Sequence, residues 1–503
     1  MDFSHIVEPA LAVSTDLLVI ACLGDPSKDA TFRLVDGAVK KALSESAEAE
    51  SFEGKSTQSL TFRVTTGLGA RRVAVLGAGA RGELGPAGLR DLGAQAVQLA
   101  NRLGARSLAL VAPALGAARE ASTVQHLVEG AVLGSYKFDR YLTGADAKKP
   151  TTLKEFGVLT DPKGKKPSAA QGRAVKASLE RGQVVAAAVN RARTMVNEPA
   201  GFMTPTQVAA EAEAIAKKHP SVTVQILGAK KCEELGMGMF LAVGRGSDQE
   251  SKLVHLTYKP KKARKKVALI GKGVTFDSGG YSLKPSNAME DMKVDMSGAA
   301  AVISAIDAIA TLGSDCEVHA VAACCENLVS GRAYKLGDVL TSMDGTTVEI
   351  NNTDAEGRLT LGDAITFVRT KVQPDEMFDF ATLTGACMVA LGPYTAGVMS
   401  DHEALCKAWL ATAERTGEDM WRLPLNGRLR EQLKSSVADM RNTGDRFGGA
   451  ITAGLFLKTF ARDTPWVHVD LAGPASLSTA RPAQPRGGTG FAVATIVEYL
   501  AKR

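Results

Sequence analysis

The chain has 503 residues, enough for about two to four domains, and its 45% hydrophobic and 23% charged residues exclude the disordered and fibrous classes. Its 60 Lys and Arg residues against 54 Asp and Glu residues give a net charge of +6, and all six excess charges lie in the basic run 259–266. Since the charges balance outside this run, a protein that coats nucleic acid through a broadly basic surface is excluded as well.

The seven cysteines are scattered, odd in number and without a Cys-x-x-Cys pair, which favours reduced thiols in a reducing compartment. No stretch reaches the roughly 18 apolar residues of a membrane-spanning helix. The apolar run Leu17–Leu23 follows Asp16 and is typical of a strand rather than a signal peptide. We therefore expect a soluble cytoplasmic protein with no membrane segment.

Strands and a helix alternate in the first part of the chain, which predicts an α/β domain. Strands are expected at Leu17–Ala21, Val73–Leu76 and Leu108–Val111. Between the last two, Pro86–Leu103 has helical spacing. Residues 144–168 are then polar, rich in lysine and interrupted by prolines, with one strand-like piece, Phe156–Leu159. We place the end of the first domain there.

A long helix should follow, from Ser168 to about Met195, because this stretch is rich in helix formers and ends before Pro199. Beyond it helices and strands alternate again, which predicts a second α/β domain. Its strands are expected at Val222–Ile226, Leu253–Tyr258, Val267–Ile270, Val318–Ala323, Met377–Thr382 and Val467–Leu471, with helices at Thr206–Lys218, Gly298–Ala310 and Ala450–Ala461. The predicted divisions are an N-terminal domain at 1–166, a connecting helix at 167–196 and a second domain at 197–503.

Two patterns leave alternative functions open. Gly77-Ala-Gly79-Ala-Arg-Gly82 has the spacing of a dinucleotide-binding turn, but the next strand ends at Ala112-Pro113 without the acidic residue that holds a ribose. A structural turn is therefore favoured over a nucleotide-dependent oxidoreductase. The run 259–266 suits a solvated loop or a phosphate-binding patch and has no aromatic residue to stack on a base, so a DNA-binding or regulatory role is the second alternative.

Two common catalytic arrangements are missing from the sequence. The seven histidines are isolated and form no His-Glu-x-x-His pair, which argues against a zinc site built from histidines. There is also no Gly-x-Ser-x-Gly segment, the usual marker of a serine hydrolase.

The segment Asp354-Ala-Glu356-Gly-Arg358 spaces three charged residues by two positions, and in an extended segment all three side chains would point to one side. Two carboxylates on one side repel each other unless a cation lies between them, and hard oxygen ligands suit Mg, Mn or Zn. The alternative is an exposed pair of Glu356 and Arg358 in a loop.

Four further charged residues lie where α/β sheets place their sites, at strand ends and helix starts. They are Lys272 and Asp277 after a predicted strand, Lys284 before a proline, and Asp295 before a predicted helix. Each also has an ordinary structural explanation, as a solvated lysine, an Asx turn or a helix N-cap.

At these residues the sequence resembles the leucyl aminopeptidase (cytosol aminopeptidase) family. Asn352-Thr-Asp-Ala-Glu-Gly-Arg-Leu359 resembles the signature octapeptide of that family. Further segments resemble family segments in the family's order: Gly271–Gly280, Met292–Met296, Ala381–Ala386, Trp421–Leu425 and Gly449–Ala453. The resemblance is strong over residues 190–503 and weak over residues 1–165.

The resemblance implies an N-terminal Rossmann-like α/β domain that needs no nucleotide and a C-terminal three-layer α/β/α catalytic domain with a mixed central sheet. It implies a dinuclear metallo-exopeptidase that releases N-terminal residues from peptides with a free N-terminus and assembles as a hexamer of two stacked trimers. Leu-like first residues are expected, because Met292 and Thr382-Leu383 resemble walls of the family's pocket for that side chain.

The resemblance also implies the ligands of two divalent metal ions, Mn or Zn with Mg or Co as alternatives. By motif position Asp277 and Glu356 would bridge the two ions, Asp354 would complete the first site, and Lys272 and Asp295 would complete the second. As a ligand Lys272 must be neutral, and removing its proton at pH 7 costs about 4–5 kcal/mol.

Lys284 and Arg358 match the family's two catalytic positions. The metal ions would activate water for attack on the scissile carbonyl, and the free α-amine of the substrate would ligate the second ion. Protonated Lys284 would stabilise the developing oxyanion, and Arg358 would hold a bicarbonate that moves the proton.

Overall fold

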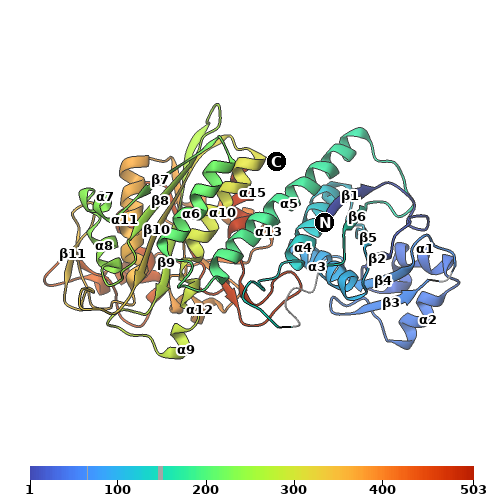
Figure 1. Ribbon diagram of the computed structural model, residues 1–503, viewed down its shortest axis with the longest axis horizontal. Coiled ribbons are helices and arrows are strands. Elements are labelled where there is room, and N and C mark those ends of the chain that lie inside the picture. Colours follow the sequence, from blue (N-terminus) through green and yellow to red (C-terminus); the bar gives the residue numbers. More distant parts are fainter. Residues whose placement is uncertain (65, 145–150, 503) are drawn as a thin grey trace. The chain divides into compact units, whose positions relative to one another are not determined.

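The computed structural model describes residues 1–64, 66–144 and 151–502. It divides into two compact units, Met1–Ala187 with Thr479–Pro485, and Ala188–Ser478 with Arg486–Arg503. The division falls inside the long helix α5 (Ala169–Asn197), which begins in the first unit and ends in the second (Figure 1). The predicted boundaries near 166 and 196 stay a prediction, and residues 145–150 of the predicted polar segment lie outside the described residues.

The first unit is built on a six-stranded sheet with the order β1-β6-β5-β2-β4-β3, in which only the β3–β4 pair is antiparallel. Its strands are β1 (Asp2–Ile6), β2 (Leu17–Cys22), β3 (Ser59–Arg63), β4 (Arg72–Gly77), β5 (Ser107–Val111) and β6 (Glu155–Leu159), and its helices are α1 (Ala30–Ala38), α2 (Ala42–Ala49), α3 (Pro86–Arg102) and α4 (Glu120–Gly134). One core packs α3 and α4 against the sheet and a second packs α1 and α2. The predicted Rossmann-like α/β domain is confirmed.

The second unit is built on an eight-stranded mixed sheet with the order β15-β14-β17-β13-β9-β10-β8-β7. Its strands are β7 (Val222–Leu227), β8 (Lys252–Tyr258), β9 (Lys265–Asp277), β10 (Cys316–Asn327), β13 (Glu376–Ala381), β14 (Ala396–Met399), β15 (Met420–Arg422) and β17 (Trp466–Asp470). The central strands β17, β13, β9 and β10 are mutually parallel. Their carboxyl ends therefore meet at one edge of the sheet.

Helices cover both faces of this sheet (Figure 1). One face carries α6 (Pro205–Lys218), α10 (Ser297–Leu312), α13 (Glu403–Thr416) and α15 (Val493–Leu500), and the other carries α8 (Gly238–Gly244), α11 (Glu356–Phe367) and α14 (Gly449–Ala461). This is the predicted three-layer arrangement. Smaller elements are α7 (Ala229–Glu234), α9 (Ser286–Met289), α12 (Gly385–Leu391), the short helix η3 (Met292–Met296), the strands β11 (Val339–Thr341), β12 (Thr347–Glu349) and β16 (Met440–Arg441), and the pair β18 (Ser476–Leu477) and β19 (Gly487–Gly488).

Strand β9 is longer than predicted, because it continues through two glycines instead of ending at Ile270. A Cβ at Gly271 would lie 2.6 Å from the backbone of Ala299, and one at Gly298 would lie 1.9 Å from the carbonyl oxygen of Phe380. Glycine at both positions lets the first turn of α10 pack directly on the sheet. The strand thereby carries its last residues to the edge where the parallel strands end.

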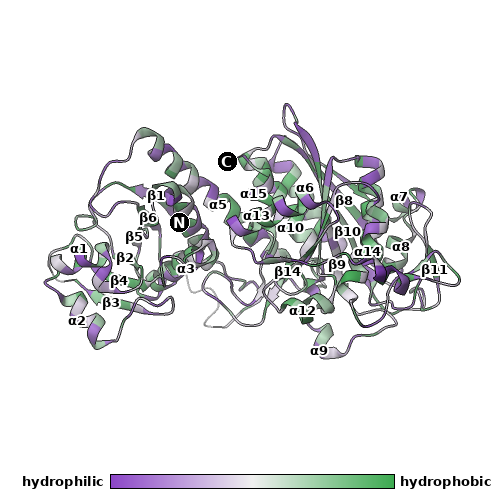
Figure 2. Ribbon diagram, turned by 180° about the vertical axis from the view of Figure 1, so that it is seen from behind, coloured by the Kyte–Doolittle hydropathy of each residue, from purple (hydrophilic) through white to green (hydrophobic). Residues whose placement is uncertain are grey.

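A helix can also be tested for a membrane span by its length and mean hydropathy, which is a less strict criterion than an unbroken apolar run. Residues Met292–Leu312 pass that test, but 83% of the apolar window is buried inside the structure. Figure 2 colours α10, which forms most of this stretch, mainly as hydrophobic. A core helix of a globular domain has these properties, since it is covered by protein on several sides.

Candidate active site

The seven residues predicted for the site all lie in the second unit, near the carboxyl ends of its parallel strands. Strand β9 supplies Lys272 and Asp277, the loop after it supplies Lys284, and η3 supplies Asp295. The remaining three, Asp354, Glu356 and Arg358, lie at the start of α11. The structure thus brings together residues that are separated by up to 86 positions in sequence.

Lys272 lies between two buried carboxylates. Its Nζ atom is 2.6 Å from Asp295 Oδ1 and 2.8 Å from Glu356 Oε1, and it also donates to the carbonyl oxygen of Thr382 at 3.0 Å. Burial disfavours the ammonium, but the carboxylates of Asp295 and Glu356 outweigh burial and raise the pKa of Lys272 above its usual value. Burial also raises the pKa of Asp295 well above its usual range, although Lys272 opposes this.

Lys284 also contacts two carboxylates, and its side chain is more exposed than that of Lys272. Its Nζ atom is 2.8 Å from Asp277 Oδ2 and also contacts Asp354 Oδ1. The second oxygen of Asp277 accepts hydrogen bonds of 2.8 Å from Asn327 Nδ2 and from the backbone N–H of Gly279. Burial, followed by repulsion from nearby Glu356, raises the pKa of Asp277.

Three carboxylates converge closely enough to share a cation. Asp277, Asp354 and Glu356 each offer one oxygen, and these oxygens lie within 4.8 Å of one another. Two buried oxygens, Asp295 Oδ2 and Glu356 Oε2, have no hydrogen-bond partner among the described residues. Buried carboxylate oxygens without donors are costly, and a hard divalent cation satisfies them. The residues present therefore fit a divalent metal site.

The extended conformation predicted for 354–358 is wrong, because α11 begins at Glu356. Residues two positions apart on a helix point in nearly opposite directions, so Glu356 faces Lys272 while Arg358 donates from Nη1 to the carbonyl oxygen of Asn442 at 2.8 Å. Burial lowers the pKa of Arg358 to about 10. The alternative of an exposed Glu356–Arg358 pair is also wrong, since both side chains are buried.

Several polar residues of the site were not predicted as such. Asn327 donates to Asp277 and to the carbonyl oxygen of Thr353, and Thr382 donates to Asp295 Oδ1 at 2.8 Å. The backbone carbonyl oxygen of Asn442 accepts from Arg358. Asn327 lies opposite Asp277 in the register of β9 and β10. The position of Asn327 at a strand end was the one feature of the sequence that could have marked it as a site residue. Thr382 lies in a segment that resembles the family, but it was predicted only as a wall of the substrate pocket.

Comparisons with known proteins show the family of the chain. The family model described as "Cytosol aminopeptidase family, catalytic domain" matches residues 190–497, and the model for the N-terminal domain of the same family matches residues 19–145. The chain belongs to the cytosol aminopeptidase family. A probable cytosol aminopeptidase of Gloeobacter violaceus is 41% identical over 489 residues, which cover 96% of either chain. One of Aquifex aeolicus is 39% identical and covers 93% of this chain and 92% of the relative.

Solved structures agree with the family. A mutant of tomato leucine aminopeptidase matches with a TM-score of 0.86 and 35% identity over 99% of this chain and 97% of the tomato chain. The bottromycin maturation enzyme BotP, in complex with Mn, matches with a TM-score of 0.82 and 34% identity over 96% of this chain and 98% of BotP. The predicted two-domain α/β fold and the resemblance are confirmed. The protein is a metal-dependent aminopeptidase and therefore a hydrolase.

Packing explains the glycine turn that suggested an oxidoreductase. A Cβ at Gly77 would lie 2.0 Å from the carbonyl oxygen of Lys55, so only glycine fits there. The basic run is partly neutralised, because Lys265 pairs with Glu376 at 2.6 Å and Arg264 with Asp315 at 3.6 Å. The Gly77 turn belongs to the first unit, whereas the carboxylates of the candidate site belong to the second.

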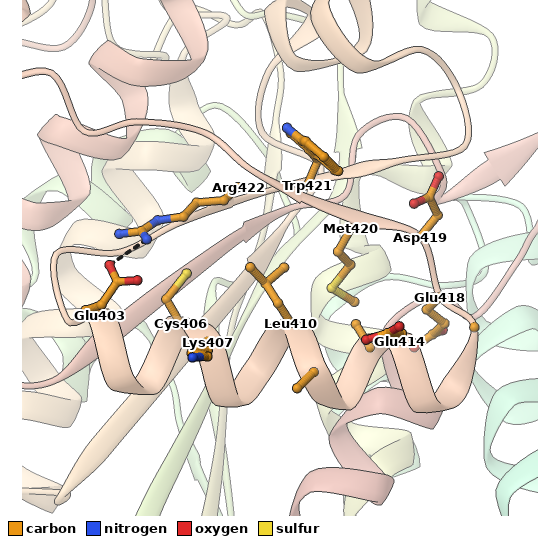
Figure 3. Close-up of a pocket in the computed structure, with 13 residues that line it drawn as sticks. Glu403, Cys406, Lys407, Leu410, Glu414, Glu418, Asp419, Met420, Trp421 and Arg422 are labelled. Atoms are coloured by element: carbon orange, nitrogen blue, oxygen red, sulfur yellow. Dashed lines mark hydrogen bonds and ion pairs between the residues drawn. The ribbon is translucent and has the colours of Figure 1, made fainter.

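A separate groove of about 780 Å³ lies between α13 and the edge strand β15. Figure 3 shows Leu410 of the helix opposite Met420 of the strand, and the Arg422–Glu403 ion pair of 2.5 Å beside Cys406. None of the seven predicted site residues lines this groove. It is therefore distinct from the candidate active site.

Proposed function

We propose that this aminopeptidase binds two divalent metal ions per chain and releases Leu-like N-terminal residues from peptides. The observation that carries the proposal is the convergence of the carboxylates of Asp277, Asp354 and Glu356 within 4.8 Å, with Asp295 joined to them through Lys272. Four carboxylates around two lysines supply more negative charge than two ammonium groups balance, which favours divalent cations.

In this proposal Asp277 and Glu356 would help to hold both ions. Asp354 would complete one metal site, and Asp295 and Lys272 would complete the other. The partnerless oxygens Asp295 Oδ2 and Glu356 Oε2 support the assignment, since they are buried and have lone pairs available. Lys272 has to give up its proton to ligate, and because ligating side chains must be deprotonated, metal binding would release that proton to solvent.

When bound, the ions, Mn or Zn with Mg or Co as alternatives, lower the pKa of water and so supply hydroxide near neutral pH. Lys284 is proposed to act as an ammonium ion, since its Nζ atom lies 2.8 Å from Asp277 Oδ2 and its side chain is 14% exposed. It can therefore donate a hydrogen bond to the substrate carbonyl oxygen as negative charge develops there. Arg358 is proposed to hold a bicarbonate, and its Nε atom has no hydrogen-bond partner among the described residues.

Substrate selection would follow from the same residues. A free N-terminal amine can add to the second metal site, and an acylated amine cannot, which would restrict the enzyme to unblocked peptides. The preference for Leu-like residues is proposed from Met292 and Thr382-Leu383 beside the site. The likeness to proteins named cytosol aminopeptidase supports a cytoplasmic location. A homohexamer is proposed from the resemblance alone, and light scattering can test it.

The decisive experiment measures hydrolysis of leucyl-coumarin and N-acetyl-leucyl-coumarin before and after chelation, followed by metal add-back. The proposal expects activity on the free amine only, its loss on chelation, and its return with two equivalents of Mn or Zn. Equal cleavage of both substrates, or full activity after complete removal of metal, would refute it.

A further inference from the structure

Two histidines that are isolated in sequence face each other on the second sheet. His255 on β8 and His319 on β10 are 9% and 7% exposed, and His255 Nε2 lies 2.9 Å from His319 Nδ1. Thr257 Oγ1 is 3.3 Å from the first of these nitrogens and 3.2 Å from the second. Three donor atoms of three side chains therefore form a nearly equilateral triangle.

The register of the sheet fixes this arrangement. Strands β8 and β10 are antiparallel, with His319 opposite Thr257 and Val321 opposite His255. Alternate residues of a strand point to the same face, so all three side chains project from one face of the sheet. The T-shaped contact of the His255 ring with Phe367 holds that ring from the side.

The outer nitrogen of His319 is held by a carboxylate. His319 Nε2 lies 2.9 Å from Glu317 Oε1, and because an ionised carboxylate only accepts, Nε2 carries the proton and Nδ1 presents a lone pair to the triangle. Histidines that ligate metals are commonly held by a carboxylate in this way. His255 Nδ1 is buried without a hydrogen-bond partner among the described residues.

Both rings are suited to act as neutral ligands. Burial, followed by the neighbouring His319, lowers the pKa of His255 to about 4, and burial also lowers the pKa of His319 despite Glu317. The alternative is an ordinary hydrogen bond between two neutral imidazoles, with Thr257 bonded to either. The 2.9 Å distance fits that alternative, so an experiment must separate the two.

We propose that His255, His319 and Thr257 form a binding site for one divalent transition metal ion, outside the aminopeptidase site. Metal–nitrogen bonds of 2.0–2.1 Å at tetrahedral angles place ligand atoms about 3.3 Å apart, close to the three distances observed. Imidazole ligands select Zn, Ni or Cu, whereas the carboxylates near Lys272 suit harder ions as well. A bound ion would join β8 to β10.

The register also separates this site from the candidate active site. His319 pairs with Ala268 of β9, and Lys272 follows four residues later on the same strand. At 3.3 Å per residue these levels are about 13 Å apart. The active-site set contains no histidine, so coordination by two imidazoles distinguishes the new site from the candidate active site.

The test adds one equivalent of Cu²⁺ to the zinc-loaded full-length enzyme and records pulsed EPR, which detects the remote nitrogen of a coordinated imidazole. The wild type should show modulation from two imidazoles, and Glu356→Ala, which alters the active-site set, should keep it. His255→Ala and His319→Ala should each lose the two-imidazole pattern. Absence of the pattern in the wild type, or its loss in Glu356→Ala, overturns the proposal.

Two further variants control for misfolding of the histidine variants. Thr257→Val keeps the shape of the side chain without its oxygen, and it should weaken Cu²⁺ binding at least several-fold. His402→Asn alters an exposed histidine that caps α13 and should keep the full signal. Unchanged affinity in Thr257→Val, or loss of the signal in His402→Asn, would overturn the three-donor site.

Discussion

A side chain at position 357 would occupy the space that Lys272 fills. A Cβ added to Gly357 would lie 2.5 Å from Lys272 Cε and 2.7 Å from its Nζ atom. Because Gly357 has no side chain, Lys272 can reach the carboxylate of Glu356, the preceding residue of α11. The glycine at position 357 therefore leaves the space that Lys272, a proposed ligand of the second metal ion, needs.

Gly357→Ala should displace Lys272 and weaken metal binding by about 10–100-fold, the usual range when the support of a ligand is lost. Alanine is the better helix former by about 1 kcal/mol, so loss of α11 is not the expected cause. Metal titration and circular dichroism check both points. Gly37→Ala in α1, where an added Cβ meets nothing within 4 Å, is the matched control. Wild-type metal affinity in Gly357→Ala would contradict the role of Lys272.

The proposed bridging residues should differ from Asp354 in metal content. Asp277→Ala and Glu356→Ala should abolish activity and lower the metal content at both sites, because each is proposed to contact both ions. Asp354→Ala, whose side chain is 34% exposed, should chiefly weaken one site. Elemental analysis after dialysis measures metal per chain. Two ions per chain in Glu356→Ala would refute the bridging assignment.

The sequence predicted which residues gather at the site better than it predicted their local structure. The motifs identified the carboxylates and lysines, but the start of α11 was missed because its N-cap, Ala355, makes no side-chain hydrogen bond. Local patterns mark helix starts mainly through Ser, Thr, Asp or Asn caps. Asn327 was missed for another reason, since its contact with Asp277 depends on the pairing of β9 with β10. Such pairing is non-local and leaves no signal in either segment alone.

The same limit applies to the fold. Strands with continuous apolar runs, such as β2 and β5, were predicted nearly to the residue. Strand β1 was missed, because it has one partner strand, β6, and its residues are only partly buried. The pair of His255 and His319 was also hidden, since 64 residues separate the two histidines and only the sheet register joins them.

Asp344 should make stability depend on pH in the acid range. Its carboxylate accepts from Arg462 at 2.9 Å and Arg369 at 3.2 Å and from Ser342 and Thr346. Burial works against the charged form, but Arg462 and the two hydroxyl groups lower the pKa of Asp344 to about 2. Since this is below the unfolded value of about 3.9, the stabilisation is fully present above pH 4 and is lost as the pH falls towards 2.

Asp344→Asn should therefore lower the free energy of unfolding at pH 7 by about 1–2 kcal/mol, after allowance for solvent screening near the surface. The difference from the wild type should shrink as the pH falls from 4 to 2. Urea unfolding across this range measures it. Asp248→Asn, which breaks an exposed pair with Arg332, should leave the free energy of unfolding nearly unchanged. A difference that stays constant down to pH 2 would argue against the ion pairs as its source.

The two lysines of the site give the most discriminating prediction, because they lie 12 positions apart and are proposed to act in opposite protonation states. Lys272 is 3% exposed between Asp295 and Glu356, and as a neutral ligand it should hold metal. Lys272→Ala should therefore lose metal from one site and depend strongly on added metal for activity. Lys284 is more exposed and should act as a cation on the substrate oxygen. Lys284→Ala should keep both ions and lose about 10²–10³ in kcat.

Lys284→Arg tests whether charge alone is sufficient at that position. The guanidinium is larger and planar, so it should restore little of the lost kcat although its charge is the same. Metal stoichiometry and kcat of the three variants are measured together on leucyl-coumarin. If Lys284→Ala loses a metal ion while Lys272→Ala keeps both, the two roles are reversed. If neither alanine variant changes either quantity, the two lysines are structural and the proposed site lies elsewhere.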